Sequence, residues 1–157
     1  MDDTARPALR WPAGRVRCRV ARRGAALMEA MHLKLEEIAR LIRANVIAGA
    51  DKLCTLDIDT ACGADLMSDV LAFCHERTLL LTGLTSPQVV RSAEVAGLSG
   101  IVFVRGKKPG DDVIELANAL GIPLLATDYP MFETCGMLYR AGIGGTHRFS
   151  RAEGTSC

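Results

Sequence analysis

Residues 78–129 read TLLLTGLTSPQVVRSAEVAGLSGIVFVRGKKPGDDVIELANALGIPLLATDY. This stretch contains three short apolar runs, each about as long as a β-strand, at residues 78–82, 101–104 and 122–126. None of the runs alternates polar with apolar residues, which is typical of strands that are covered on both faces. The two segments between the runs, 87–96 and 111–120, have the apolar spacing of helices.

Alternating strands and helices of this kind predict parallel strands that are joined by right-handed crossovers. A further amphipathic segment, opened by Pro130, follows the last run. We therefore predict a single α/β domain, a three-layer sandwich around a mostly parallel central sheet. Functional residues are then expected in the loops at the carboxyl ends of the strands.

The composition limits the class of protein. A length of 157 residues suits one domain, and a net charge of +1 argues against a dedicated nucleic-acid binder. Hydrophobic residues make up 49% of the chain, but no run approaches the roughly 18–20 apolar residues of a membrane span. We find no apolar segment of the signal-peptide type, so we expect a cytoplasmic protein, no membrane partner, and six cysteines present as thiols.

Residues 1–30 carry seven arginines against three acidic residues and show no sustained apolar period. We predict a disordered basic extension, with Met28 or Met31 as the natural start. A transit peptide and a polybasic arm are alternatives, although the segment contains no serine. The domain is expected over residues 31–145, and a flexible tail over 146–157.

The residues before the first apolar run have weaker patterns. The apolar spacing predicts a helix over 33–44, a short strand over 46–48 and a second helix over 64–75. Residues 55–59 alternate at period two and predict a half-exposed edge strand. From residue 141 onward glycine, threonine, serine and arginine dominate, which predicts fraying.

Asp65, Ser68 and Asp69 are spaced to share one face of the predicted second helix. They favour either a docking site for a partner or cation, or a solvated polar stripe. Two carboxylates without a third ligand hold hard cations poorly, so we predict no metal site.

Three loops are expected to meet at one edge of the sheet, at residues 82–86, 105–109 and 127–129. An anionic small molecule would be attracted by the free N–H groups where the helices start, at Pro87 and Asp111. The basic side chains of the 105–109 loop would attract it as well. The candidate ligand-binding residues are Thr82, Gly83, Thr85, Ser86, Arg105, Gly106, Lys107 and Thr127. The alternative is that the hydroxyls only cap helices and the lysines are solvated.

Catalytic signatures are missing. The chain has no GxxxxGK[ST] and no GxSxG motif, and its glycine-rich residues 142–145 follow a helix rather than a strand. Cys74 and His75 cannot act as a pair, because adjacent helical residues point about 100° apart. Cys62 and Cys135 each precede a glycine and could approach one another. We predict no catalytic residues, and no cofactor is indicated.

Several segments in order resemble the DRTGG domain. They are LTG at 81–83, IVFVRGKKP at 101–109, VIELA at 113–117 and GIPLLATDY at 121–129. Residues 64–72 and 132–139 strengthen the likeness, which covers 33–143 and is greatest to the free-standing kind found beside genes for iron-only hydrogenases. Related domains are fused to CBS pairs, to phosphotransacetylases and to HPr kinases.

The resemblance implies an accessory module that senses a ligand or regulates and often pairs with itself. It does not imply kinase activity. It also implies a link to hydrogenase or energy metabolism, with a protein partner from such a system. The chain departs from the family name at two places. It has LT at 84–85 in place of an acidic–basic pair, and RGK at 105–107 in place of TGG.

We therefore predict a non-catalytic regulatory or ligand-sensing domain. One alternative is a small enzyme that acts on a phosphorylated or acyl-phosphate substrate through residues 105–108. Another is a protein-docking module without a small ligand. The apolar side chains of Met131, Phe132, Met137 and Tyr139 near the end of the domain further predict a homodimer.

Overall fold

The computed structural model describes residues 32–146. The strands are β1 (Leu33–Lys34), β2 (Asn45–Ala48), β3 (Asp57–Ile58), β4 (Thr60–Gly63), β5 (Thr78–Thr82), β6 (Gly100–Phe103), β7 (Leu124–Ala126) and β8 (Gly144–Gly145). The helices are α1 (Leu35–Leu41), α2 (Met67–Phe73), α3 (Pro87–Val95), α4 (Asp111–Leu120) and α5 (Met131–Arg140), with a short 3-10 helix η1 (Ala50–Lys52). The order of these elements is that of an α/β domain.

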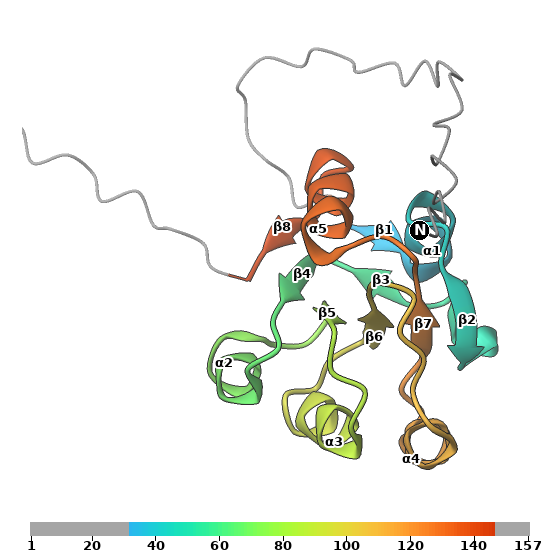
Figure 1. Cartoon of the computed structure of the whole chain (residues 1–157). Coiled ribbons are helices and arrows are strands. Elements are labelled where there is room, and N and C mark those ends of the chain that lie inside the picture. The colour runs from blue at the N-terminus through green and yellow to red at the C-terminus, as the bar shows by residue number, and fades with distance from the viewer. Residues whose placement is uncertain (1–31, 147–157) are drawn as a thin grey trace, which may run out of the picture.

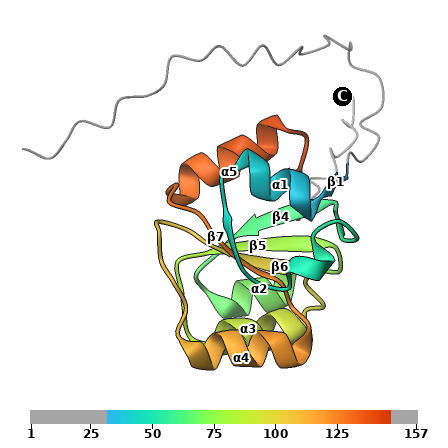
Figure 2. The ribbon, with the colours of Figure 1, turned by 90° about the vertical axis from the view of Figure 1, so that its right-hand side faces the viewer.

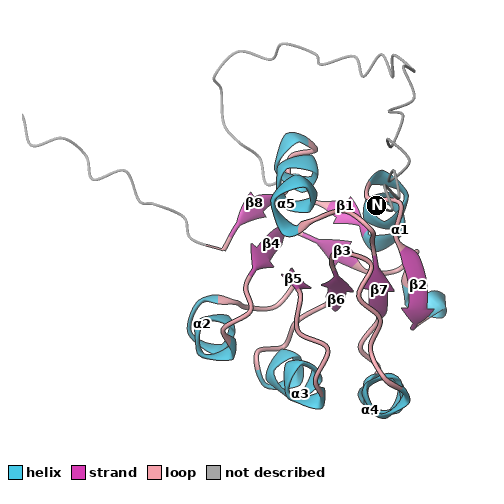
Figure 3. Ribbon diagram, viewed as in Figure 1, coloured by secondary structure: helices cyan, strands magenta, loops and turns pink. Residues whose placement is uncertain are grey.

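The central sheet has six strands in the order β2-β7-β6-β5-β4-β8 (Figure 1, Figure 3). Neighbouring strands from β7 to β8 are parallel, and β2 runs antiparallel to β7 at one edge. Strands β1 and β3 form a separate antiparallel pair. The prediction of a mostly parallel central sheet in one α/β domain is confirmed.

Helices cover both faces of this sheet. Helices α2, α3 and α4 lie on one face, and α1 and α5 lie on the other (Figure 1, Figure 2). Strand β5 shows why its apolar run does not alternate: Leu80 belongs to the core under α2–α4, whereas Leu79 and Leu81 belong to the core under α1 and α5. All three leucine side chains are fully buried, as expected for a strand covered on both faces.

The predicted strands and helices of residues 78–140 are confirmed, with boundaries that differ by a few residues. Gly97 and Gly121 follow α3 and α4 with φ of +68° and +69°. Glycine adopts this left-handed conformation without a steric penalty, so it ends each helix where the sequence predicts.

The half-exposed edge strand predicted over 55–59 is confirmed only in part. Within that range only Asp57–Ile58 is extended, and it pairs with β1 outside the central sheet. The strand that lies beside β5 is β4, which runs from Thr60 through Ala61 and Cys62 to Gly63. These small residues have weak β-propensity, which is why the apolar pattern did not indicate a strand.

Two further boundaries differ from the prediction. The prediction that the chain frays from residue 141 is wrong for β8, because Gly144 and Gly145 pair in parallel with Thr60 and Ala61 of β4. The first helix, expected over 33–44, is limited to α1, because residues 33–34 form β1 instead.

The predictions of a basic extension over residues 1–30 and of a tail to residue 157 fall on residues outside the described range. Within 32–146, no helix has the length and apolar character needed to cross a membrane.

Thr127 joins the α1 layer to the sheet. Its hydroxyl is buried and donates a hydrogen bond of 2.6 Å to the carbonyl oxygen of Ile42 at the end of α1. The same hydroxyl oxygen accepts a hydrogen bond of 3.3 Å from the Tyr129 amide. The last carbonyls of a helix lack partners within the helix, so the bond to Ile42 satisfies one of them.

We predict that Thr127→Val, which keeps the side-chain shape but removes the hydroxyl, lowers the free energy of unfolding by about 1–3 kcal/mol. Urea denaturation followed by circular dichroism measures this loss. Thr55→Val is the matched control, because the Thr55 hydroxyl also bonds a backbone carbonyl, that of Lys52, but is exposed. Equal losses in the two variants would contradict this role of Thr127.

Candidate functional site

The carboxyl ends of the parallel strands meet at one edge of the sheet. Thr82 at the end of β5 pairs with Phe103 of β6, and Phe103 pairs with Ala126 of β7. The loops that follow these strands therefore start side by side. This is the gathering of residues 82–86, 105–109 and 127–129 that the sequence predicts.

A fourth loop, after β4, also reaches this edge. Asp65 lies in that loop, two residues before α2 begins. Its Oδ1 atom accepts a hydrogen bond of 2.7 Å from the Gly83 amide and one of 2.9 Å from the Thr82 hydroxyl. The Asp65 carboxylate is thus held by the loop that follows the neighbouring strand.

The environment favours the ionised form of Asp65. The hydrogen bond from the Gly83 amide is the largest of the effects that lower the pKa of this carboxyl group below its ordinary value. Burial, the second-largest effect, raises the pKa, whereas the Thr82 hydroxyl and the positive charges of Lys107 and Arg105 lower it further. Asp65 is therefore an anion at neutral pH.

The loop after β6 has an unusual backbone. Arg105 and Gly106 have φ of +61° and +64°, and the Arg105 conformation is uncommon for a residue with a side chain. The Arg105 amide donates to the Tyr129 carbonyl and the Gly106 amide to the Thr127 carbonyl, both at 2.9 Å. These two amides are used to join the loops, so the anion-binding groups that this loop offers are its side chains.

Lys107 connects this loop to the loop after β5. Its Nζ atom donates a hydrogen bond of 2.8 Å to the Gly83 carbonyl. A Cβ atom placed on Gly83 would lie 3.5 Å from both Lys107 Nζ and Asp65 Oδ2. The absence of a side chain at Gly83 therefore leaves space between the positive charge of Lys107 and the negative charge of Asp65.

This space belongs to a cavity of about 250 Å³, which we call the polar pocket. It is lined by Asp65, Gly83, Val104, Arg105, Lys107 and Met131. Of the predicted ligand-binding residues, Gly83, Arg105 and Lys107 line this pocket and Thr82 supports it through Asp65.

The other predicted ligand-binding residues lie at the same edge but are not among the lining residues. Thr127 is buried against α1, and Gly106 joins the β6 and β7 loops through its amide. Ser86 occupies the N-cap position of α3, as predicted, but makes no capping hydrogen bond through its side chain. Thr85 is half-buried beside it.

The prediction that Asp65, Ser68 and Asp69 share one helix face is wrong, because α2 starts later than expected, at Met67. Only Ser68 and Asp69 lie on α2, where both are exposed, whereas Asp65 precedes the helix and bonds Thr82 and Gly83. Sequence reasoning missed the role of Asp65 because the strand before it was not recognised.

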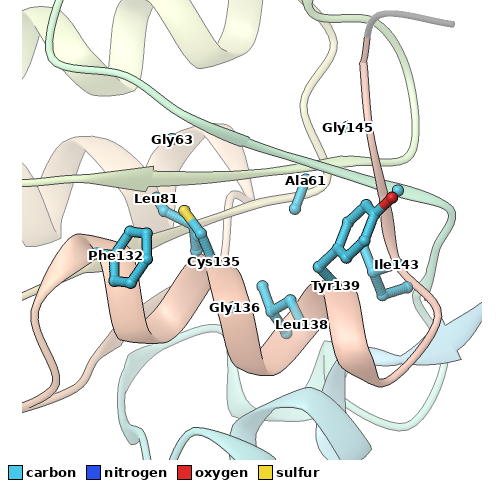
Figure 4. A pocket seen from close by; sticks show the side chains of 11 residues that line it. Ala61, Gly63, Leu81, Phe132, Cys135, Gly136, Leu138, Tyr139, Ile143 and Gly145 are labelled. Carbon is cyan, nitrogen blue, oxygen red and sulfur yellow. The ribbon is translucent and has the colours of Figure 1, made fainter.

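A second cavity of about 380 Å³, which we call the apolar groove, runs along α5 beside β4 and β8 (Figure 4). Figure 4 shows Phe132, Cys135 and Tyr139 along the helix, with Ala61 and Gly145 on the other side. The remaining lining residues are Gly63, Leu81, Gly136, Leu138, Ile143 and Gly144. The sequence did not predict this groove, since two of its walls are the unrecognised strands.

Three of the cysteines influence one another. Burial, together with a hydrogen bond to the Cys62 thiol, raises the pKa of Cys74 to about 12. Burial, with a smaller effect of Cys62, also raises the pKa of the Cys135 thiol. Thiols with raised pKa values are poor nucleophiles and metal ligands at neutral pH. Within residues 32–146 no group of three or more His, Cys, Asp or Glu side chains is placed to hold a metal ion.

The family profile of the DRTGG domain matches residues 37–141, which is more than half of the chain. No curated protein matches the chain.

A solved structure has a similar fold. It contains the CBS and DRTGG domains of the regulatory region of Clostridium perfringens pyrophosphatase, complexed with its activator, diadenosine tetraphosphate. The TM-score is 0.59 at 15% sequence identity, and the match covers 70% of this chain and 47% of that chain. The present chain therefore spans about half the length of that solved chain, and at this identity the similarity establishes the fold.

Proposed function

Because this chain belongs to the DRTGG domain family, we propose that it is a regulatory module that senses an anionic small molecule in the polar pocket. The observation that carries the proposal is the pairing of two basic side chains, Arg105 and Lys107, in one cavity. Neither forms an ion pair with any residue of the described part of the chain. An anion that enters the pocket would pair with both positive charges.

The lining of the polar pocket supports binding rather than turnover. It contains no serine, cysteine or histidine, and its single acid is held ionised by two hydrogen bonds. The lining offers no hydroxyl or thiol nucleophile, and the Lys107 amine is held in a hydrogen bond with the Gly83 carbonyl. We therefore propose a non-catalytic, cytoplasmic sensor, with an enzyme acting on a phosphorylated or acyl-phosphate substrate as the alternative.

We predict that Arg105→Ala abolishes the thermal stabilisation given by an anion that binds the pocket. The panel contains inorganic phosphate, nucleotides and acyl phosphates, and a ligand at 100 times its Kd stabilises by about 2.7 kcal/mol. Gly83→Ala should have the same effect, because its methyl group would enter the pocket at ordinary contact distances.

Arg77→Ala is the matched control for this experiment. Arg77 has nearly the same left-handed backbone as Arg105, with φ of +62°, but lies before β5 at the opposite edge of the sheet. Equal loss of stabilisation in Arg77→Ala would contradict the assigned site. Conversion of an acyl phosphate or nucleotide to product would favour the enzyme.

The second part of the proposal is a homodimer formed through α5. Phe132 and Tyr139 are 85% and 74% exposed, and Gly136 lies between them on the same face. Glycine inside a helix costs about 1 kcal/mol relative to alanine, yet a Cβ atom on Gly136 would meet nothing within 4 Å. Packing within one chain therefore does not explain this glycine, whereas close approach of a second helix would.

The residues around Gly136 are complementary to themselves in an antiparallel arrangement. A two-fold axis at Gly136 pairs each position with the one equally far on its other side. Phe132 would then face Arg140 of the second copy, a cation–π contact. Glu133 would face Tyr139, whose hydroxyl can donate to the carboxylate.

We predict that Phe132→Glu weakens dimerisation at least about tenfold, since exposed aromatic residues often dominate such contacts. Sedimentation equilibrium measures the dissociation constant. An acid in the first turn of α5 is compatible with the helix dipole, so the fold should persist. Gly136→Leu should also weaken the dimer, by blocking close approach.

The control is Val95→Glu, which places the same charge at an exposed apolar residue of α3 on the other face of the sheet. A wild-type chain that stays monomeric at high concentration would refute the dimer. A dimer that Val95→Glu disrupts and Phe132→Glu does not would move the interface away from α5.

We also propose, as a second candidate function, that α2 docks a protein partner from an iron-only hydrogenase system. The exposed polar residues Ser68 and Asp69 lie beside Leu66 and Leu71, which are 61% and 49% exposed. Asp69→Arg should reduce co-purification of hydrogenase-system proteins from a cell extract, while Asp112→Arg on α4 should not. Unchanged recovery with Asp69→Arg would contradict docking at α2.

A further inference from the structure

The polar pocket already holds an anion, and that anion is part of the chain. The Asp65 carboxylate accepts hydrogen bonds from the Gly83 amide and the Thr82 hydroxyl at 2.7 and 2.9 Å. A backbone N–H and a hydroxyl at a strand end are the kind of donors that bind the phosphate oxygens of ligands. Asp65 therefore satisfies the donors that an incoming anion would need.

The charges in the pocket are not balanced by this arrangement. Arg105 and Lys107 contribute two positive charges, and Asp65 contributes one negative charge. Lys107 Nζ bonds the Gly83 carbonyl rather than the carboxylate, and no ion pair joins Lys107 to Asp65 within the described residues. One positive charge is left for a ligand while Asp65 stays in place, and two are left when it leaves.

We propose that Asp65 is a built-in competitor for the polar pocket, and that a phosphorylated ligand binds by displacing its carboxylate from the Gly83 amide and the Thr82 hydroxyl. This inference rests on the proposed function, since it requires that the pocket take an anion. It adds the class of ligand and the event by which binding is sensed.

The preference for a phosphoryl group follows from the exchange. A ligand carboxylate would replace Asp65 with a group of the same charge and geometry, so it gains little. A phosphate monoester carries about −1.5 to −2 charges at neutral pH and three acceptor oxygens. It can bond the Gly83 amide while it also meets Arg105 and Lys107, which a single carboxylate does less well.

Displacement of Asp65 also gives the binding event a consequence. Asp65 lies between β4, which ends at Gly63, and α2, which begins at Met67. The two hydrogen bonds of Asp65 join this short connection to the loop after β5. Their loss frees the connection, so occupancy of the pocket is transmitted to α2 and to the exposed surface of Ser68 and Asp69.

The test compares inorganic phosphate and acetate by isothermal titration calorimetry on wild type, Asp65→Asn and Asp51→Asn, a control at an exposed aspartate of η1. Asparagine keeps the shape of Asp65 and can still accept from Gly83, but it carries no competing charge. We expect Asp65→Asn to bind phosphate about tenfold tighter than wild type, consistent with the greater strength of hydrogen bonds to charged groups. Asp51→Asn should bind phosphate as wild type does, and acetate should bind more weakly than phosphate throughout.

Phosphate binding to Asp65→Asn that is equal to or weaker than binding to wild type would overturn the inference. The proposed function would survive that result as long as wild type binds an anion from the panel in an Arg105-dependent manner. Binding of acetate as tightly as phosphate would overturn the assignment of the ligand class.

A second measurement uses the unmodified chain and does not depend on the folding of a variant. In ¹⁵N-labelled wild-type protein, saturating phosphate should shift the amide resonances of Gly83 and of residues 64–67 together, because Asp65 leaves its donors. A shift at Arg105 and Lys107 with residues 64–67 unchanged would show binding beside an undisplaced Asp65, and would overturn the inference.

Discussion

The parallel pairing of β4 with β5 places the Asp65 carboxylate of the polar pocket beside Gly83. Its register sets Gly63 opposite Leu81, so the chain continues with Asp65 beside Gly83. A shift of one residue would turn the side chains to the other face of the sheet. The same parallel arrangement, continued through β6 and β7, brings Arg105 and Lys107 to the edge where Asp65 lies.

The β5–β7 part of the fold is readable from the sequence because its strands are buried on both faces. Continuous apolar runs such as residues 101–104 indicate buried parallel strands when helical segments and helix-ending glycines lie between them. The approach of Thr82, Arg105 and Thr127 then follows from the parallel arrangement alone. The sequence does not distinguish a hydroxyl that faces a ligand from a hydroxyl that bonds the end of a helix, as that of Thr127 does.

Strand β4 could not be recognised for a physical reason. Ala61, Cys62 and Gly63 have small side chains that give little β-propensity, and the strand is specified by pairing with β5 and β8 on its two sides. Without β4, the sequence pattern places Asp65 on a helix and predicts that it belongs to a docking face. The error concealed both the polar pocket's acid and the apolar groove, since each depends on that strand.

A crystal structure of the full chain, from crystals grown with phosphate, tests the central claim most directly. It shows which atom accepts the hydrogen bond from the Gly83 amide. The account predicts a phosphate within hydrogen-bond distance of the Gly83 amide, Arg105 and Lys107, with the Asp65 side chain turned away. A Gly83 amide still bonded to Asp65 in fully occupied crystals, with the phosphate bound elsewhere, would contradict it.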